Sequence, residues 1–360
     1  MALSITPSRH WLGNDGPWST FDVRIGLAQK LVQVLPATSV SLTLAVLEEG
    51  CTASEPLTCE ALRGDVLHPV DLATWNNITA ANGYQNLAVQ FPTEEFYFEA
   101  GVPSRMGVSS LGFADLNETL QGQLIAGYVQ KTPFLGFLGL SGREQYAANA
   151  STAYPSPLQT LKNTSAVSGL TWAYTAGAYY KKPESFGSLT FGGYDSSRVN
   201  MDEALTGVNF LRDFNGNELT LTMKSITVGD QTSNATGLVA QLDSTVPDIW
   251  LPQSIYPLFE EKFDLQWNES VGMYMVSEEQ RARLQSENTS VSFELAAPDS
   301  DSSRSVTITL PYSAFDHEVK FPLANITDDN TTLYYFPLKR LPDDTPGFQI
   351  FLGRTFFQEA

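Results

Sequence analysis

The sequence predicts an all-β protein that is built from two related lobes. Short apolar runs between frequent turn residues indicate strands, and long runs with helical periodicity are scarce in the 360 residues. A strand that runs into a turn rich in Thr and Ser occurs twice, at residues 31–39 and at residues 236–246. The two turns lie 206 positions apart, at residues 37 and 243. An internal duplication of this kind predicts two lobes with the same plan.

Each turn is followed about a hundred positions later by an apolar pair and a glycine. The first such stretch is Phe137-Leu138-Gly139, and the second is Phe351-Leu352-Gly353. The repeat therefore extends beyond the two turns to a later part of each lobe.

The second turn carries a carboxylate, Asp243, which is followed by the hydroxyls of Ser244 and Thr245. A turn between two strands lifts the Asp out of the sheet, and the hydroxyls can hold its oxygens by hydrogen bonds. An isolated Asp-Ser-Thr turn is more often an Asp that satisfies its own backbone. The duplicated plan is what favours a functional carboxylate at this position.

With these parts in this order, the chain resembles the pepsin-like aspartic peptidases over nearly its whole length. Asp243-Ser244-Thr245 matches the second active-site turn of that family, residues 187–195 (Gly-Ser-Leu-Thr-Phe-Gly-Gly-Tyr-Asp) resemble the end of its first lobe, and residues 219–229 resemble the early strands of its second lobe. The resemblance implies a bilobal pepsin-like acid-protease fold, with two six-to-seven-stranded β lobes and a cleft between them. We place the N-terminal lobe at residues 1–199 and the C-terminal lobe at residues 200–360.

The first turn departs from the pattern of the family, in which each lobe supplies one Asp to the base of the cleft. Ala37 stands where the first Asp is expected, Thr38 follows it, and Ser39 stands where Gly is usual. The chemistry of the family needs two carboxylates that share one proton and one water. Loss of one acid–base partner costs on the order of 10²–10⁴-fold in rate.

Another carboxylate could replace the missing one, and three candidates are near in sequence. Asp248 is expected to leave the turn along the next strand, and Glu48 and Glu49 lie at the far end of the strand after Ala37. None of these spacings predicts a return to the position beside Asp243.

The family also has a hairpin flap with a Tyr that folds over the substrate. Tyr84 and Tyr97 are candidates by position, but no Tyr-Gly-x-Gly occurs, and ordinary core or surface tyrosines are the simpler interpretation. A missing flap would remove a substrate clamp and a water excluder.

Local patterns predict the remaining elements. Alternation at residues 21–26 predicts a half-buried strand, and residues 155–162 predict a short helix with Ser156 as cap and Pro157 in the first turn. The same reasoning predicts a second-lobe helix at residues 255–263 and strands at residues 170–174, 307–310 and 334–338.

Composition excludes several classes of function. With 42% hydrophobic and 17% charged residues the chain is an ordinary folded protein, and its net charge of −19 argues against nucleic-acid binding. Secretion and plain solubility explain that charge equally well. His10, His68 and His317 are scattered without metal-ligand spacing, so surface or capping roles are predicted, and no metal and no cofactor is expected.

Nine Asn-x-Ser/Thr sequons are present, whereas chance would give about three. This excess predicts a heavily glycosylated protein of the secretory pathway. The nine acceptor residues are Asn77, Asn117, Asn149, Asn163, Asn234, Asn268, Asn288, Asn325 and Asn330.

Cys51 and Cys59 lie eight positions apart in a polar loop. The resemblance places a small disulfide loop here, worth about 2–3 kcal/mol by the loop-length model, and two free thiols are the alternative. No signal peptide or membrane span is visible in the sequence, and a membrane anchor beyond Ala360 is a hypothesis. We expect a monomer that is secreted or lies on the outer face of the cell.

The leading hypothesis is an aspartic-peptidase homologue that has lost hydrolysis and binds a peptide or protein in or near the cleft. Residues 192–197 and 243–247 resemble the surface-anchored pepsin-like proteins of filamentous fungi. The rival is an active acid endopeptidase that uses Asp243 with a non-standard partner. Arg354 follows the closing Gly where the family often has Asp. It is either a surface charge or the partner of a carboxylate at the lobe interface.

Overall fold

The computed structural model describes residues 1–52, 55, 58–78, 104–146, 152–199, 219–297, 305–328, 330–341 and 349–359. The chain forms two compact units. Residue 200, where the sequence places the lobe boundary, lies outside the described residues, so that boundary stays a prediction. Unit 1 comprises residues 1–13, 18–174 and 186–195, and unit 2 comprises residues 14–17, 175–185 and 196–360.

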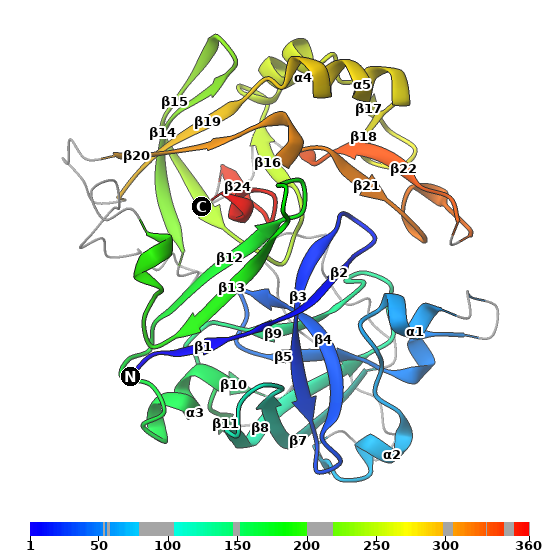
Figure 1. Ribbon diagram of the computed structural model, residues 1–360, viewed down its shortest axis with the longest axis vertical. Coiled ribbons are helices and arrows are strands. Elements are labelled where there is room, and N and C mark those ends of the chain that lie inside the picture. The colour runs from blue at the N-terminus through cyan, green and yellow to red at the C-terminus, as the bar shows by residue number, and fades with distance from the viewer. Residues whose placement is uncertain are drawn as a thin grey trace. The chain divides into compact units, whose positions relative to one another are not determined.

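The main sheet of unit 1 has eight strands in the order β2-β3-β4-β9-β5-β8-β7-β6, one more than expected from the sequence (Figure 1). An additional pairing between β3 and β7 closes six of these strands into a ring, which removes their free edges. The strands are β2 (Pro7–Leu12), β3 (Trp18–Ile25), β4 (Lys30–Ala37), β5 (Thr43–Val46), β6 (Asn76–Asn77), β7 (Ser104–Phe113), β8 (Thr119–Tyr128) and β9 (Gly136–Gly139).

Strand β3 shows why this part of the chain forms a sheet. Phe21, Val23 and Ile25 are fully buried, whereas Asp22 and Arg24 between them are partly exposed. The predicted half-buried strand is therefore confirmed, since side chains on a strand point alternately to opposite faces. The apolar half of this alternation builds the core of unit 1.

The helices in the first half of the chain are short. Helix α3 begins where the sequence predicts. Ser156 Oγ accepts a hydrogen bond from the backbone N–H of Gln159 at 3.2 Å, and the Gln159 side chain accepts one from the Ser156 N–H at 2.8 Å. This reciprocal pair is a capping box, and Pro157 fits the first helical position because it needs no N–H there. The helices are η1 (Glu48–Gly50), α1 (Cys59–Leu62), α2 (Pro69–Leu72), α3 (Pro157–Asn163) and η3 (Ser196–Arg198), the last of which belongs to unit 2.

Two smaller sheets complete the N-terminal half of the chain. In one, β1 near the N-terminus pairs antiparallel with β13, which lies beside β12 (Figure 1). The strand predicted at residues 170–174 is the beginning of β12. The strands of these sheets are β1 (Leu3–Ile5), β12 (Trp172–Ala178) and β13 (Ser185–Phe191), and β10 (Gln145–Tyr146) with β11 (Ala153–Tyr154).

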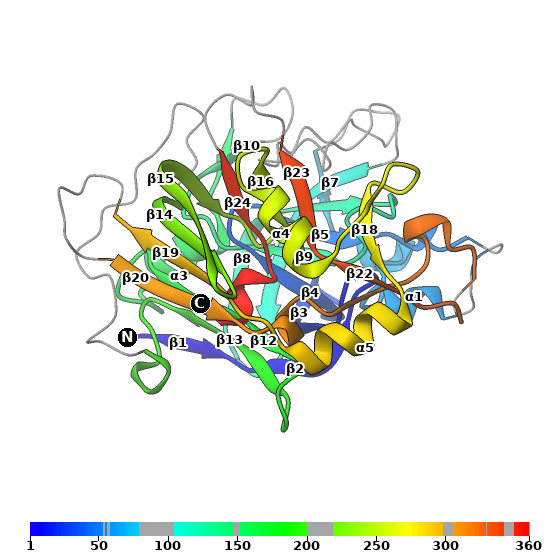
Figure 2. The ribbon, with the colours of Figure 1, turned by 90° about the horizontal axis from the view of Figure 1, so that it is seen from above.

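Unit 2 contains a seven-stranded sheet in the order β20-β19-β14-β15-β24-β16-β23, and Figure 2 shows β24 between β15 and β16. A four-stranded sheet has the order β17-β18-β22-β21. The strands are β14 (Thr220–Val228), β15 (Gln231–Leu242), β16 (Ile249–Pro252), β17 (Trp267–Asn268), β18 (Met273–Val276), β19 (Val291–Ala296), β20 (Ser305–Leu310), β21 (His317–Val319), β22 (Leu333–Phe336), β23 (Leu338–Leu341) and β24 (Ile350–Leu352).

An aromatic cluster forms the centre of unit 2. Phe336 stacks on Phe315 at 4.9 Å between ring centroids, and Phe263 packs against Phe336 at the same distance. Phe259 and Phe263 lie four residues apart on α4, so both face this core, as the predicted helix requires. The helices of unit 2 beyond η3 are α4 (Tyr256–Phe263), α5 (Glu278–Glu287), η4 (Tyr312–Ala314), η5 (Leu323–Asn325) and η6 (Phe356–Gln358).

The predicted all-β class is confirmed, because sheets dominate both units. Within the described residues, the helices are too short or too polar for any of them to cross a membrane.

Candidate active site

The turn at Ala37 lies inside a four-stranded motif of unit 1. Strand β4 leads into the turn and β5 leaves it, while β9 pairs parallel with β4 and antiparallel with β5. The register places Ala37 opposite Gly139 and Leu44 opposite Phe137. Strand β8 then pairs parallel with β5, which gives the order β4-β9-β5-β8.

Unit 2 repeats this motif around Asp243. Strand β15 leads into the turn and β16 leaves it, while β24 pairs parallel with β15 and antiparallel with β16. Leu242 lies opposite Leu352, the Asp243 N–H donates to the Leu352 carbonyl at 3.0 Å, and Trp250 lies opposite Phe351. Since Leu44 follows Ala37 at the same spacing as Trp250 follows Asp243, Ala37 and Asp243 hold equivalent positions.

The glycine that closes each repeat is explained by a close approach of backbones. A Cβ added to Gly139 would lie 2.4 Å from the Ser41 carbonyl carbon, and one added to Gly353 would lie 2.2 Å from the Asp248 carbonyl oxygen. Real Cβ atoms do not come so close to backbone atoms, because proteins are packed at van der Waals distances. The apolar pair followed by Gly thus marks the strand that passes directly beneath each turn.

Asp243 is completely buried, and its carboxylate is held by its own turn. The Thr245 backbone N–H donates to Asp243 Oδ1 at 3.0 Å, and the Thr245 hydroxyl donates to the same oxygen at 2.7 Å. Hydrogen bonds to a carboxylate are among the strong ones. The predicted role of a hydroxyl in holding Asp243 is confirmed for Thr245, and Ser244 beside it is also buried.

The equivalent turn in unit 1 keeps the hydroxyl but lacks the carboxylate. Ala37 is completely buried and Thr38 is 3% exposed. Ser39, which corresponds to Thr245, has a buried Oγ with no hydrogen-bond partner within the described part of the chain. A buried hydroxyl is normally paired, so Ser39 occupies the place of a donor whose acceptor is absent.

Arg354 is a buried residue that supports the Asp243 turn, so the surface interpretation of this residue is wrong. One guanidinium nitrogen donates to the carbonyl oxygens of Ser244 at 3.0 Å and Thr245 at 2.9 Å, and another donates to Asp15 Oδ2 at 2.7 Å. Asp15 belongs to the same unit as Arg354. The arginine therefore ties two carbonyls of the turn to a carboxylate near the N-terminus.

His317 packs behind the same turn, and the surface or capping role predicted for it is wrong. Its side chain is buried, and Nε2 lies 3.1 Å from the hydroxyl of Thr355, the residue after Arg354. Burial, which disfavours the charged imidazolium, lowers the pKa of His317 from 6.5 to about 4. His317 is therefore neutral in the folded protein at neutral and mildly acidic pH.

This lowered pKa predicts a loss of stability in acid. The unfolded chain binds a proton at its His317 below about pH 6.5, whereas the folded chain resists it until about pH 4. The free energy of unfolding is therefore highest, as far as His317 determines it, above about pH 6.5. It falls as the pH drops toward 4, by about 3 kcal/mol in total, since each pKa unit is worth about 1.36 kcal/mol. Urea unfolding of the unchanged chain and of His317→Gln between pH 4 and 7 should show a shallower pH dependence in the variant. Parallel curves would contradict this assignment.

The alternative carboxylates lie where their positions in the sequence predict. Glu48 and Glu49 begin η1 beyond the end of β5, and Glu49 pairs with Arg105 at 2.6 Å. Asp248 is buried in unit 2, just before β16. The flap candidates Tyr84 and Tyr97 lie outside the described residues.

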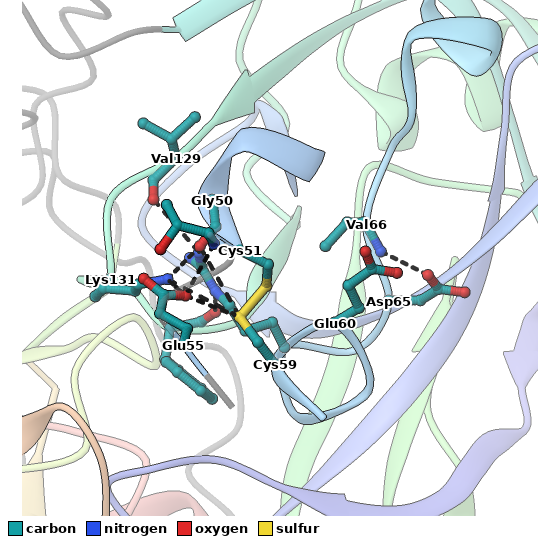
Figure 3. Close-up of a disulfide and its surroundings, with 12 residues drawn as sticks. Gly50, Cys51, Glu55, Cys59, Glu60, Asp65, Val66, Val129 and Lys131 are labelled. Atoms are coloured by element: carbon teal, nitrogen blue, oxygen red, sulfur yellow. Dashed lines mark hydrogen bonds and ion pairs between the residues drawn. A yellow bond between two sulfur atoms is a disulfide. The ribbon is translucent and has the colours of Figure 1, made fainter. Parts of the chain in front are cut away.

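The disulfide between Cys51 and Cys59 is present, with an S–S distance of 2.01 Å and a Cα–Cα distance of 5.8 Å. Figure 3 shows it beside Lys131 and Glu55, which form an ion pair. The bond closes the loop that leads from η1 into α1, because Cys59 is the first residue of that helix. The pairing implied by the family resemblance is thus confirmed.

Six of the nine predicted glycan acceptors are exposed. Exposure is a requirement for a glycan and does not by itself establish one, so glycosylation stays a prediction. Asn149 lies outside the described residues, as do the side chains of Asn77 and Asn234. The six exposed acceptors are Asn117, Asn163, Asn268, Asn288, Asn325 and Asn330.

A strand–turn–strand motif that is present twice, with a buried turn carboxylate in one copy, defines the class of aspartic-peptidase folds. The family model of the eukaryotic aspartyl proteases matches residues 114–326, which is more than half of the chain. The chain belongs to this family. A solved aspartic proteinase from Irpex lacteus is similar in fold, with a TM-score of 0.56 and 14% sequence identity over 99% of this chain and 92% of that one. No curated protein sequence matches the chain.

Proposed function

We propose that this chain is a catalytically impaired member of the family that binds a peptide or protein without cleaving it. The observation that carries the proposal is the register of the two repeats, which puts Ala37 at the position equivalent to Asp243. A methyl group can neither ionise nor carry the proton that the two carboxylates share. Asp243 alone would hold a water but would lack the acid that polarises the scissile carbonyl.

A second candidate function is an active acid endopeptidase that uses Asp243 with a non-standard partner. The observation that favours it is the set of hydrogen bonds that hold Asp243 and its turn. The carboxylate accepts two hydrogen bonds from Thr245, and Arg354 donates to carbonyls of the turn. These contacts hold the Asp243 turn in one position, which a catalytic carboxylate requires.

The proposal includes a secreted or cell-surface glycoprotein of the kind found in filamentous fungi. The disulfide supports an oxidising compartment, and the six exposed acceptor residues could carry glycans. The net charge of −19 is compatible with the same location. The proposal also includes a monomer and, for the cell-surface alternative, a membrane anchor outside this sequence.

The test is digestion of a complex peptide mixture by the protein, purified from the medium of a eukaryotic secretory host. Products are read by mass spectrometry from about pH 3 to pH 7, the range in which carboxylates titrate. The matched control is Asp243→Ala. We expect no cleavage by either protein, while immobilised protein enriches intact peptides from the mixture. Glycan mass on the secreted protein checks the secretory part of the proposal.

Cleavage by the unchanged chain that disappears in Asp243→Ala would establish the endopeptidase and reject the binder. Absence of both cleavage and peptide enrichment would reject the peptide-binding proposal.

A further inference from the structure

Three potential metal ligands converge in unit 1, although they are spread over nine positions of the sequence. One carboxylate oxygen of Glu60, one of Asp65 and one ring nitrogen of His68 all lie within 4.8 Å of one another. Figure 3 shows the Glu60 and Asp65 side chains next to each other on the side of α1 away from Lys131. None of the three residues belongs to either turn of the duplicated motif.

The backbone between α1 and α2 brings these side chains together. Gly64 and Asp65 have φ angles of +74° and +71°, so the chain reverses immediately after α1. A side chain at Gly64 is excluded, because its Cβ would lie 2.3 Å from the Gln33 carbonyl oxygen. After the reversal the chain is extended at His68, which is the N-cap residue of α2. Glu60 on α1 and His68 before α2 thereby face each other.

The imidazole of His68 has carboxylates at both ring nitrogens. Nε2 lies 3.8 Å from Glu60 Oε2, and Nδ1 lies 3.5 Å from Glu48 Oε2. Both separations exceed the roughly 2.7–3.2 Å of an N–H···O hydrogen bond. A metal-binding histidine has a similar layout, with one nitrogen facing the metal and the other facing a carboxylate that fixes the ring. Glu60 and Asp65 would then share the metal side, and Glu48 would lie behind the ring.

The local charge balance favours a cation. Glu48, Glu60 and Asp65 supply three carboxylates, and Lys30, whose Nζ lies 2.8 Å from Asp65 Oδ2, balances the charge of one of them. Each of these carboxylate side chains is 46% exposed, so an ion from solvent can reach them. Asp65 Oδ1 accepts a hydrogen bond from the Val66 N–H at 2.7 Å, so this carboxylate is held in place and an ion would compete with Lys30 for its other oxygen.

We propose that Glu60, Asp65 and His68 bind a divalent transition-metal ion of the zinc type, with Glu48 orienting the imidazole. One nitrogen and two carboxylate oxygens form a donor set that suits Zn²⁺, whereas Mg²⁺ and Ca²⁺ prefer oxygen ligands throughout. The ion would link α1 to the start of α2 beside the disulfide, and Glu48 would connect η1 to the site through the imidazole. The site could not be predicted from the sequence, because the spacing of Glu60, Asp65 and His68 along the chain matches no known metal-ligand motif.

The experiment is calorimetric titration of the tag-free full chain with ZnCl₂, and with MgCl₂ for comparison. We expect one saturable zinc site and no comparable magnesium site. His68→Ala should weaken zinc binding by more than about 100-fold, and Glu48→Gln by about 10–100-fold, the usual effect of losing an outer partner of a ligating histidine. Lys30→Gln should tighten binding several-fold, because it removes the cation that competes for Asp65. His10→Ala, which changes an exposed histidine outside the cluster, is the matched control.

Failure to detect saturable zinc binding would overturn the proposal. Zinc binding that His68→Ala leaves unchanged would place the ion elsewhere and would overturn it as well, as would tighter binding of Mg²⁺ than of Zn²⁺. If His68→Ala does not fold, Glu60→Gln serves as the ligand variant, since this side chain is about half exposed and the change keeps its size. Thermal unfolding with and without zinc gives an independent readout, because an ion bound only to the folded chain raises the melting temperature.

Discussion

Peptide cleavage at acid pH is expected to appear when Ala37 is changed to Asp, at a rate on the order of 10²–10⁴-fold above that of the unchanged chain. The register puts the new carboxylate at the position equivalent to Asp243. Ser39 Oγ, which has no partner in the described chain, is placed like the Thr245 hydroxyl that donates to Asp243. The structure therefore favours keeping Ser39 over replacing it by the glycine that is usual in the family.

Two controls separate restored chemistry from other effects of the Ala37→Asp change. Ala37→Asn has nearly the same size but no ionisable group, so it should stay inactive. Ala37→Asp combined with Asp243→Asn should also be inactive, because two carboxylates act as a unit. The rate of the active variant should depend on pH through two coupled titrations, which give a bell-shaped profile. An inactive Ala37→Asp protein with the melting temperature of the unchanged chain would show that more than a carboxylate is missing.

The fold was predictable where a short sequence pattern is made by the same residues that form the contacts of the folded protein. The two turn motifs and their later apolar pairs predict the duplicated sheet, because each part of the repeat occupies the same register position. The beginning of α3 is marked by Ser156 and Pro157, and α4 by the spacing of Phe259 and Phe263. In each case the residues that carry the pattern are also the residues that make the contacts.

Elements without an apolar pattern escaped prediction. Helix α5 buries only Leu284, so its sequence shows no hydrophobic stripe, and Ser277 caps it by accepting the Gln280 N–H.

The strand predicted at residues 334–338 is two strands, β22 and β23, which are separated by Pro337. Proline has no N–H for a sheet ladder, although its carbonyl accepts a hydrogen bond from Ile249 at 2.9 Å.

The candidate site was predictable in its turns but not in their surroundings. Asp243, Ala37 and their hydroxyl neighbours could be found because the motif is short and repeated. Arg354 and Asp15 are 339 positions apart, and no local pattern indicates that one contacts the other. The burial of His317 depends in the same way on residues distant in sequence. Contacts between distant segments are set by the whole fold, so sequence patterns alone predict neither the buried arginine nor the neutral histidine.

Removal of the Arg354 guanidinium is expected to have the largest effect on stability. Its side chain is 3% exposed, and it supplies hydrogen bonds to two carbonyls and to Asp15. In Arg354→Met the Ser244 and Thr245 carbonyls lose their donor and Asp15 loses its cation. Breaking a buried ion pair by removing one partner costs about 3–5 kcal/mol. Urea unfolding at pH 7, followed separately by probes in each unit, should show the loss in unit 2. A loss below about 1 kcal/mol would contradict the assigned role.

The double-mutant cycle with Asp15 separates the ion pair from the support of the turn. Asp15 is 20% exposed, so Asp15→Asn alone should cost less than Arg354→Met. The coupling free energy, obtained by adding the double variant, measures the ion pair, and the part of the Arg354→Met loss beyond this coupling includes the bonds to the two carbonyls. Arg354→Lys keeps the charge but lacks the planar fork that reaches both carbonyls and the carboxylate together. Introduced into an active Ala37→Asp protein, Arg354→Lys should lower kcat more than it changes KM, because a loosened turn misplaces Asp243 without altering the peptide-binding surface. If Ala37→Asp and Ala37→Asp with Arg354→Lys have the same kcat, the arginine supports the fold alone. A fall in kcat without a matching change in KM would mean that it positions the carboxylate.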